Sequence, residues 1–279
     1  MAKKSKRKQP FTSQTQSTTS KFKHSRVETA RLIRRFHVLN KELAKCRSEV
    51  QIDTAKEQSI LVEMESLGGL DWYQKASQLG QSKTRGGDSS KWLVQTLKQY
   101  GDKNVKSLRV LDVGAVAPDN YKPYASWITA KPVDLNPQHP DIEKQDFLKM
   151  KPPVQDKDKF DIVCLSLVIN FVGDPRDRGQ MLIHTRNFLT SPTISDRLHY
   201  LFLVVPLPCV TNSRYMTHIH LLEMMTSIGY TKCLHHHFSN KLAYYLFELT
   251  EKTNVKKVHW KKKVIQDGGG KNNFSVVIE

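Results

Sequence analysis

The sequence predicts an α/β fold in which a mostly parallel sheet ends in an antiparallel hairpin and a helical extension precedes the sheet. The apolar runs at 108–113, 160–169 and 200–205 lack polar alternation, which is typical of strands covered on both faces. Segments with helical patterns separate these runs, so we expect parallel strands joined by right-handed crossovers. An alternating pair at 232–238 and 242–249, joined at Ser239-Asn240, predicts the terminal hairpin.

The composition favours a globular protein with a polyanionic partner. A chain of 279 residues, 38% of them hydrophobic, allows one sizeable domain with appendages. The 44 Lys and Arg outnumber the 27 Asp and Glu, and the net charge of +17 favours RNA or DNA as partner. A solvated basic surface is the alternative.

The composition also bounds the environment of the chain. Its four Cys are scattered without a C-x-x-C pair, so neither a disulfide framework nor a zinc site is indicated and a reducing compartment fits. We expect no membrane span, because no apolar run reaches ~20 residues, and no signal peptide.

Residues 1–25 are predicted to form a disordered basic tail. Six residues from Lys3 to Lys8 are almost all basic, and a Ser/Thr/Gln-rich run follows. Such a segment buries too little apolar surface to offset the entropy of ordering. The basic cluster indicates a nuclear or nucleolar address or an RNA-binding arm, and a solubilising tail is the alternative.

Residues 26–101 are predicted to form a helical extension. Leu32, Phe36 and Leu39 share one helical face, and a second apolar series runs from Ile52 to Met64. We expect one long helix or a helical hairpin over 27–67, whose basic face either follows a phosphate backbone or is solvated. Further helices are expected at 71–79 and 91–100, joined by a glycine-bearing loop that either folds over a ligand or simply connects them.

Residues 102–250 are predicted to form the central domain. Beyond the runs named above, we expect a short strand at 131–135 and a poorly marked one before Gln145. We expect a Pro-rich turn and helix over 119–127, and helices at 176–189 and 215–228. Residues 251–279 form a basic extension, with a short strand expected at 274–278. This extension could contact RNA by charge and stacking, or it could be a solvated edge.

The residues after the first two strands predict a ligand site. In open parallel sheets, ligands bind outside the carboxyl ends of the strands, where the strand order reverses. Gly114 has no Cβ, so the backbone can turn and a ligand can come close. Asp134, twenty residues later, suits two ribose hydroxyls. The Asp112-Val113-Gly114 motif alone also fits an ordinary connection, and a dinucleotide is disfavoured because G-x-G-x-x-G is absent.

Five βα units followed by a hairpin are the plan of the Rossmann-like class I methyltransferases. Within that plan, several motifs resemble the fungal large-subunit ribosomal RNA adenine-N1 methyltransferases. The resemblance covers residues 27–250, and the run at 206–215 is its most specific part. The motifs that carry it lie at 85–90, 111–114, 133–136, 145–147, 166–172, 177–179, 206–215 and 241–245.

The resemblance implies S-adenosyl-L-methionine as cofactor, 25S ribosomal RNA as substrate, and a location in the nucleus and nucleolus. Gly114 would face the methionine part of the cofactor, Asp134 would accept from the ribose, and Asp146 with Phe147 would meet the adenine. The other expected cofactor-binding residues are Asp112, Arg85, Gly87 and Ser166. A metazoan branch of the family resembles an S-adenosylmethionine sensor for growth signalling. That role and a non-catalytic RNA-binding assembly factor are the alternatives to an enzyme.

The expected chemistry needs few groups. Adenine N1 already carries an in-plane lone pair, so no general base is needed. The adenine must only be taken out of its stack, with N1 aimed at the methyl group. Asn170, past the fourth strand, could accept from the N6 amino group, and Phe171 could stack on the base. Asn170 could instead cap its own loop. We expect no metal site, because neighbouring residues in the triplet His235–His237 would point to opposite faces of a strand.

Overall fold

The computed structural model describes residues 26–49, 53–69, 89–100, 107–194, 196–250 and 259–279. The predicted tail at 1–25, the helix at 71–79, the loop at 80–88 and the basic residues at 251–258 lie outside this range. No helix in these described ranges is long and apolar enough to span a bilayer.

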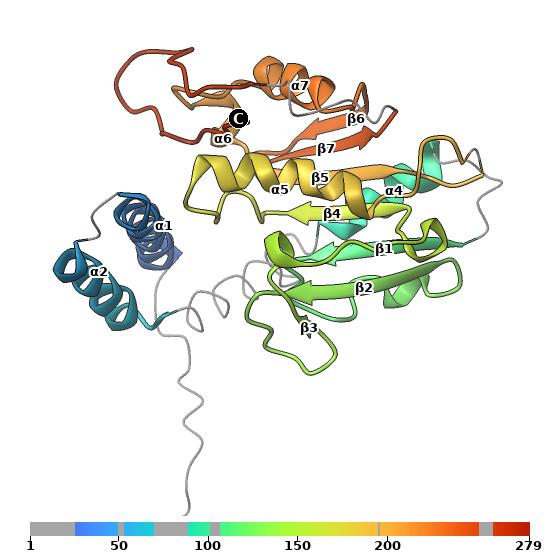
Figure 1. The fold of residues 1–279 in the computed structure, drawn as a ribbon, viewed down its shortest axis with the longest axis horizontal. Helices are drawn as coiled ribbons and strands as arrows, with labels where there is room; N and C mark the ends of the chain where they lie inside the picture. Colours follow the sequence, from blue (N-terminus) through green and yellow to red (C-terminus); the bar gives the residue numbers. More distant parts are fainter. Residues whose placement is uncertain (1–25, 50–52, 70–88, 101–106, 195, 251–258) are drawn as a thin grey trace, which may run out of the picture.

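A seven-stranded sheet in the order β3-β2-β1-β4-β5-β7-β6 forms the centre of the molecule (Figure 1). The first five strands in the chain pair in parallel, and β7 is antiparallel to both β5 and β6. This confirms the predicted α/β sheet with a terminal hairpin. The strands are β1 (Leu108–Val113), β2 (Ile128–Asp134), β3 (Glu143–Lys144), β4 (Ile162–Ser166), β5 (Tyr200–Pro206), β6 (Lys232–Phe238) and β7 (Leu242–Glu248).

Each face of the sheet has its own apolar core. Alternate residues of a strand point to opposite faces, so Leu111 packs in one core and Val110 in the other. Helices α5 (Pro175–Phe188) and α7 (His218–Ser227) contribute to the first core, and α4 (Ser90–Tyr100) contributes to the second. Figure 1 shows α5 in front of the sheet and α4 behind it.

The N-terminal residues form the helical hairpin that was one of our two expectations. Helix α1 (Arg26–Ser48) and helix α2 (Thr54–Ser66) pack through Leu39, Leu43 and Ile60. The carboxylate of Asp53 begins α2 by accepting from the backbone N–H of Lys56 at 2.9 Å. Both helices stand beside the carboxyl ends of β1, β2 and β4 (Figure 1).

The packing differs from the predicted division at both ends of the central domain. Helix α4, which we assigned to the helical extension, covers one face of the sheet with buried Leu93 and Val94. At the other end, Phe274 and Ile278 are buried in the first core, so the described part of the basic extension closes the domain. These assignments depend on what a segment packs against, which local composition does not encode.

Two predicted elements differ in kind from the observed structure. The helix expected at 119–127 is only a 3₁₀ turn, η2 (Lys122–Tyr124), because Pro123 has no N–H to continue a helix. The strand expected at 274–278 is reduced to one isolated antiparallel bridge between Trp260 and Ile278. The short elements that complete the described chain are η3 (Phe147–Lys149), η4 (Asp156–Asp158) and α6 (Pro208–Thr211).

Candidate active site

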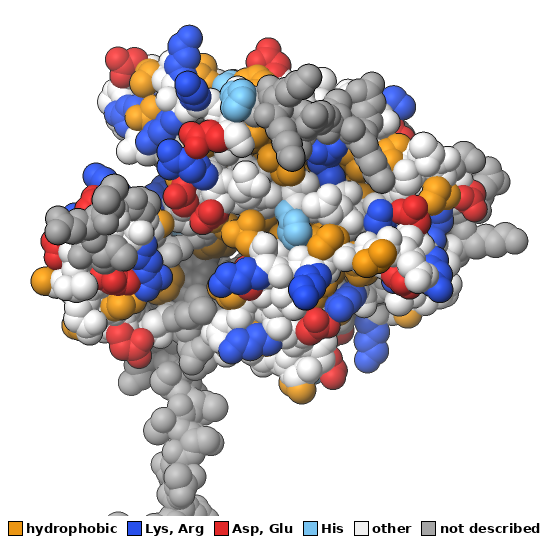
Figure 2. Space-filling model, in the orientation of Figure 1, with side chains coloured by type: hydrophobic (Ala, Val, Ile, Leu, Met, Phe, Trp, Pro, Cys, Tyr) orange, Lys and Arg blue, Asp and Glu red, His pale blue; other side chains and the backbone are white. Residues whose placement is uncertain are grey.

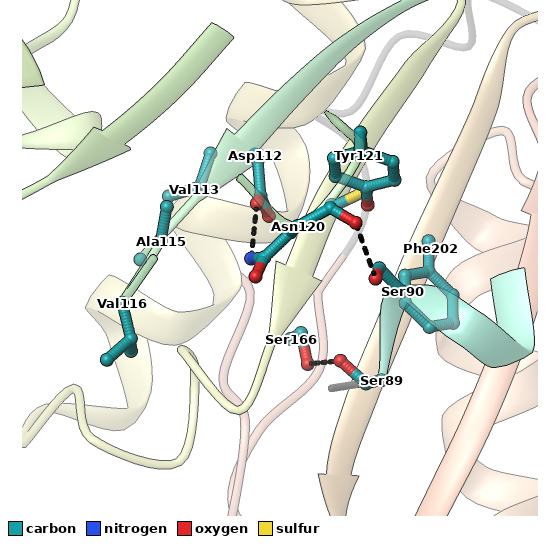
Figure 3. Close-up of a pocket in the computed structure, with 12 residues that line it drawn as sticks. Ser89, Ser90, Asp112, Val113, Ala115, Val116, Asn120, Tyr121, Ser166 and Phe202 are labelled. Atoms are coloured by element: carbon teal, nitrogen blue, oxygen red, sulfur yellow. Dashed lines mark hydrogen bonds between the residues drawn. The ribbon is translucent and has the colours of Figure 1, made fainter. Parts of the chain in front are cut away.

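A pocket lies at the carboxyl ends of β1 and β4, where the strand order reverses. This is the position at which open α/β sheets bind ligands. Figure 3 shows its residues converging from β1, the turn after β1, the start of α4 and the end of β4. The pocket is lined by Ser89, Ser90, Asp112, Val113, Gly114, Ala115, Val116, Asn120, Tyr121, Cys164, Ser166 and Phe202.

Gly114 begins the turn that forms the floor of this pocket. Its φ of +73° lies in the left-handed region, which only glycine adopts at little cost. A Cβ at this position would lie 2.7 Å from the Cγ2 atom of Val168, so there is no room for a side chain. Backbone N–H groups of Gly114 and Ala115 both donate to the carbonyl of Val133, at 2.8 and 3.1 Å, which fixes the turn against β2.

A network of polar side chains holds one wall of the pocket together. Asn120 donates to the carboxylate of Asp112 at 3.2 Å, and its backbone carbonyl accepts from the Ser90 hydroxyl at 3.5 Å (Figure 3). The hydroxyls of Ser89 and Ser166 are 2.6 Å apart. Asp112 is only 7% exposed, so its carboxylate is part of a buried network. The predicted residues Asp112, Gly114 and Ser166 therefore line one pocket.

Sequence reasoning did not identify Asn120, Ser89 and Ser90 as residues of this site. Ser89 and Ser90 belong to the motif at 85–90 and to the loop that we expect either to fold over a ligand or to connect two helices, but neither serine is a predicted site residue. The sequence places Asn120 in the Pro-rich turn that follows the first strand, and this position was the signal that could have identified it. Its contact with Asp112 depends on the irregular path between β1 and β2.

Asp134 and Asp146 lie at the same edge of the sheet, at the ends of β2 and β3. The Asp134 carboxylate accepts from the N–H of Asn136 at 2.7 Å, and its carbonyl accepts from the N–H of Gln145 at 2.8 Å. The Asp146 carboxylate caps η3 by accepting from the N–H of Leu148 at 3.1 Å and pairs with Lys149 at 3.4 Å. Both acids thus lie at the same edge of the sheet as the pocket without being among its lining residues.

Phe147 requires a correction. We expected it to meet an adenine together with Asp146, but its ring is 4% exposed and lies in the first core. Its centroid is 5.1 Å from the rings of both Phe188 and His184. A large apolar ring gains more from burial in this core than from exposure at the sheet edge. Arg85 and Gly87, also predicted to bind the cofactor, lie outside the described residues.

The loop after β4 carries Asn170 and Phe171. Leu167 has a φ of +58°, and it is the one non-glycine residue in the described chain with a positive φ. Such backbone strain persists where the surrounding structure imposes it, and it is common at functional sites. The Oδ1 atom of Asn170 is buried and has no hydrogen-bond partner among the described residues. A buried acceptor without a partner is costly, so this atom is suited to a ligand's donor.

Phe171 is held by helix α1. Its ring stacks on His37 with centroids 4.6 Å apart, and its carbonyl accepts from the Asn40 amide at 2.6 Å. One face of the ring is therefore covered, and stacking on a base could use only the other. Burial, with smaller effects of Lys41 and Arg178, lowers the pKa of His37 to about 4, so His37 is neutral at physiological pH.

Comparisons with known proteins identify relatives of the chain. The model of the family described as 25S rRNA (adenine(2142)-N(1))-methyltransferase, Bmt2, matches residues 58–276. The chain is 36% identical over 252 residues to the 25S rRNA adenine-N(1) methyltransferase of Schizosaccharomyces pombe, covering 88% of this chain and 90% of that protein. It is also 36% identical over 220 residues to the 25S rRNA (adenine(2142)-N(1))-methyltransferase of Saccharomyces cerevisiae, covering 78% of this chain and 63% of that protein.

Among solved structures, the chain is similar to a SAM-dependent methyltransferase from Leishmania major, with a TM-score of 0.41 and 11% identity. That similarity covers 78% of this chain and 83% of the other.

Proposed function

The chain belongs to the Bmt2 family of 25S rRNA (adenine(2142)-N(1))-methyltransferases, and from this premise we propose that it methylates N1 of an adenine in 25S ribosomal RNA, with S-adenosylmethionine as methyl donor. The observation that carries the proposal is the family match over residues 58–276. That range includes the whole sheet, the pocket at the β1–β4 reversal and the loop of Asn170.

The residues present fit S-adenosylmethionine, which when bound supplies an electrophilic methyl group on a positively charged sulfonium. Within the described part of the chain, the pocket lining includes the acid Asp112 and no Lys or Arg, which suits a cationic ligand. The left-handed turn at Gly114 brings its backbone into the pocket lining, where Ser89 and Ser166 offer hydroxyls. Asp134 at the end of β2 is the residue we propose for the ribose hydroxyls.

Asn170 is the residue we propose to hold the target adenine. Its Oδ1 atom accepts a hydrogen bond from the N6 amino group, which orients N1 toward the methyl group. The adenine becomes cationic as the methyl group is transferred, and an acceptor at N6 stabilises that developing charge. The buried Oδ1 atom, unpaired within the described structure, supports this role.

Nucleoside mass spectrometry of 25S ribosomal RNA tests the proposed reaction. RNA from cells that lack the protein is expected to contain less N1-methyladenosine, and the purified full chain with S-adenosylmethionine is expected to restore it. An unchanged nucleoside profile would contradict the proposal. Cofactor binding without any methyl transfer would favour the sensor alternative, and RNA binding without cofactor binding would favour an assembly factor.

We also propose that the protein acts in the nucleolus, where the basic cluster at residues 3–8 serves as an address. Deletion of residues 2–8 is expected to disperse a fluorescently tagged protein while leaving cofactor affinity unchanged. Unaltered nucleolar fluorescence after the deletion would refute the address.

A further inference from the structure

One face of α1 is fixed on the loop after β4. Asn40 donates to the Phe171 carbonyl at 2.6 Å, and a Cβ added at Gly173 would lie 2.7 Å from the carbonyl oxygen of Asn40 and 2.9 Å from the Cβ of Ala44. His37 stacks on Phe171 one helical turn earlier. Residues three and four apart share a helix face, so Lys41 lies on the same side of α1, at this contact.

Lys41 is a half-buried cation whose charged neighbours are also cations. Burial lowers its pKa, and the charges of Arg178 and Lys262 lower it further, while Cys209 acts in the opposite direction. Lys41 forms no ion pair within the described ranges of the chain. Burial raises the pKa of the Cys209 thiol to about 12, so this thiol is neutral at physiological pH and supplies no counter-charge.

Arg178 is already satisfied by backbone groups and is not available to a ligand. Its guanidinium donates to the carbonyls of Val172 and Ser275 at 2.8 and 2.6 Å and to that of Gly173 at 3.2 Å. Arg178 thus joins the loop after β4 to the C-terminal segment, and its charge lowers the pKa of Lys41. The carboxylate of Asp174 partly offsets the charge of Arg178, whereas no carboxylate of the described chain pairs with Lys41.

Lys262 brings a second available cation from the C-terminal segment. Its Nζ atom lies 4.3 Å from the ring centroid of Tyr215, and Lys261 and Lys263 on either side are exposed. A backbone hydrogen bond from Ile265 to the carbonyl of Arg214, at 2.7 Å, fixes the path of this segment. Figure 2 shows Lys and Arg side chains gathered over the C-terminal segment, at the upper left.

We propose that Lys41 and Lys262 form a phosphate-binding seam between α1 and the C-terminal segment, which holds the backbone of the substrate RNA beside the Asn170 loop. This inference rests on the proposed function, because RNA is favoured over another polyanion by the position of the seam. An RNA phosphate supplies the counter-charge that Lys41 lacks within the described chain, and condensed counterions are released when it binds. The two lysines come from opposite ends of the chain, so the seam exists only when α1 and the C-terminal segment are both docked.

The salt dependence of RNA binding tests the seam. Full-length Lys41→Gln and Lys262→Gln are compared with wild type and with Lys157→Gln, a matched loss of charge at an exposed position in η4, just before β4. The probe is an unmodified 25S ribosomal RNA transcript titrated at several KCl concentrations. Each seam variant is expected to reduce the slope of log K against log [salt] by about 0.7–0.9, and to weaken binding several-fold. Lys157→Gln is expected to match wild type.

Two further measurements separate a phosphate contact from a structural role. Lys41→Arg keeps the charge and is expected to restore the wild-type slope, and all variants are expected to keep wild-type affinity for S-adenosylmethionine. Folded seam variants with unchanged slopes would overturn the seam, as would an equal loss in Lys157→Gln. The assay measures binding alone, so failure of methyl transfer by the wild type would contradict the proposed function and leave the seam standing.

Discussion

The carboxyl edge of the sheet and the seam between α1 and the C-terminal segment are assembled in different ways. At the edge, Gly114 follows β1 directly and Asp134 and Ser166 are the last residues of the neighbouring strands β2 and β4, so the strand order alone brings them together. At the seam, the Asn40–Phe171 hydrogen bond joins residues 131 apart in the chain, and the Arg178–Ser275 hydrogen bond joins residues 97 apart. The pocket proposed for the cofactor is therefore a consequence of sheet topology, whereas the proposed RNA-binding seam depends on the docking of both chain ends.

Replacement of Gly114 by arginine is the strongest test of the edge. A side chain there would need a left-handed backbone and would collide with Val168, at 2.7 Å from the added Cβ. We expect loss of measurable S-adenosylmethionine binding by calorimetry, with the fold retained. Gly269→Arg is the matched control, because a Cβ at Gly269 meets nothing within 4 Å. Wild-type affinity in folded Gly114→Arg would contradict this site.

Replacement of Gly179 by alanine is the corresponding test of the seam. The added Cβ would lie 1.9 Å from the carbonyl oxygen of Val277, so α5 and the C-terminal segment must separate. Overpacking of this kind costs about 1–3 kcal/mol. We expect a lower free energy of unfolding in denaturant and weaker RNA binding, while Gly269→Ala behaves as wild type. Unchanged stability would show that the C-terminal segment is not docked on α5.

We expect Asp134→Ala to weaken cofactor binding at the edge of the sheet without abolishing it. The loss of a charge-assisted hydrogen bond to the ribose costs about 1.5–3 kcal/mol, so cofactor affinity is expected to fall about tenfold or more. Calorimetry at constant salt measures this change. Equal affinity in the wild type and the folded variant would remove Asp134 from the site.

Asn170→Ala tests the loop that connects the two regions. We expect unchanged cofactor affinity and a rate of methyl transfer at least about tenfold slower, since the acceptor for the N6 amino group is lost. Single-turnover kinetics with saturating RNA isolates that step. If the variant transfers methyl groups at the wild-type rate, Asn170 has only a structural role in its loop.

We expect mild acid to destabilise the contact between α1 and the loop after β4, and to leave the carboxyl edge of the sheet unchanged. The pKa of His37 is lowered from 6.5 to about 4 in the folded protein, so between these pH values the unfolded chain binds more protons. His37 therefore does not lower the free energy of unfolding above pH 6.5. Below that pH, the free energy of unfolding falls by about 1 kcal/mol or less for each pH unit. Denaturant unfolding of the wild type and His37→Phe at pH 7 and pH 5 measures the effect. An equal loss in both proteins would exclude His37.

The sequence alone determined the sheet and the position of its ligand edge. The first strand was predicted at 108–113 and observed as Leu108–Val113, because a short apolar run is a local signal of a strand buried on both faces. The hairpin followed from its alternating pattern, and the edge residues Gly114 and Asp134 followed from the ends of those strands. The tertiary structure then added Asn120, Ser89 and the first residue of α4, Ser90, to the same pocket.

Only the tertiary structure decided which segments close the molecule. A basic composition at 251–279 predicted an extension, yet Phe274 and Ile278 complete a core that α5 and α7 leave open. The ring of Phe147 was assigned to a ligand and is instead buried against Phe188. Periodicity encodes which side of an element is apolar, but the distant segment that covers it is selected by shape and by hydrogen bonds such as those of Arg178, which form only after the chain has folded.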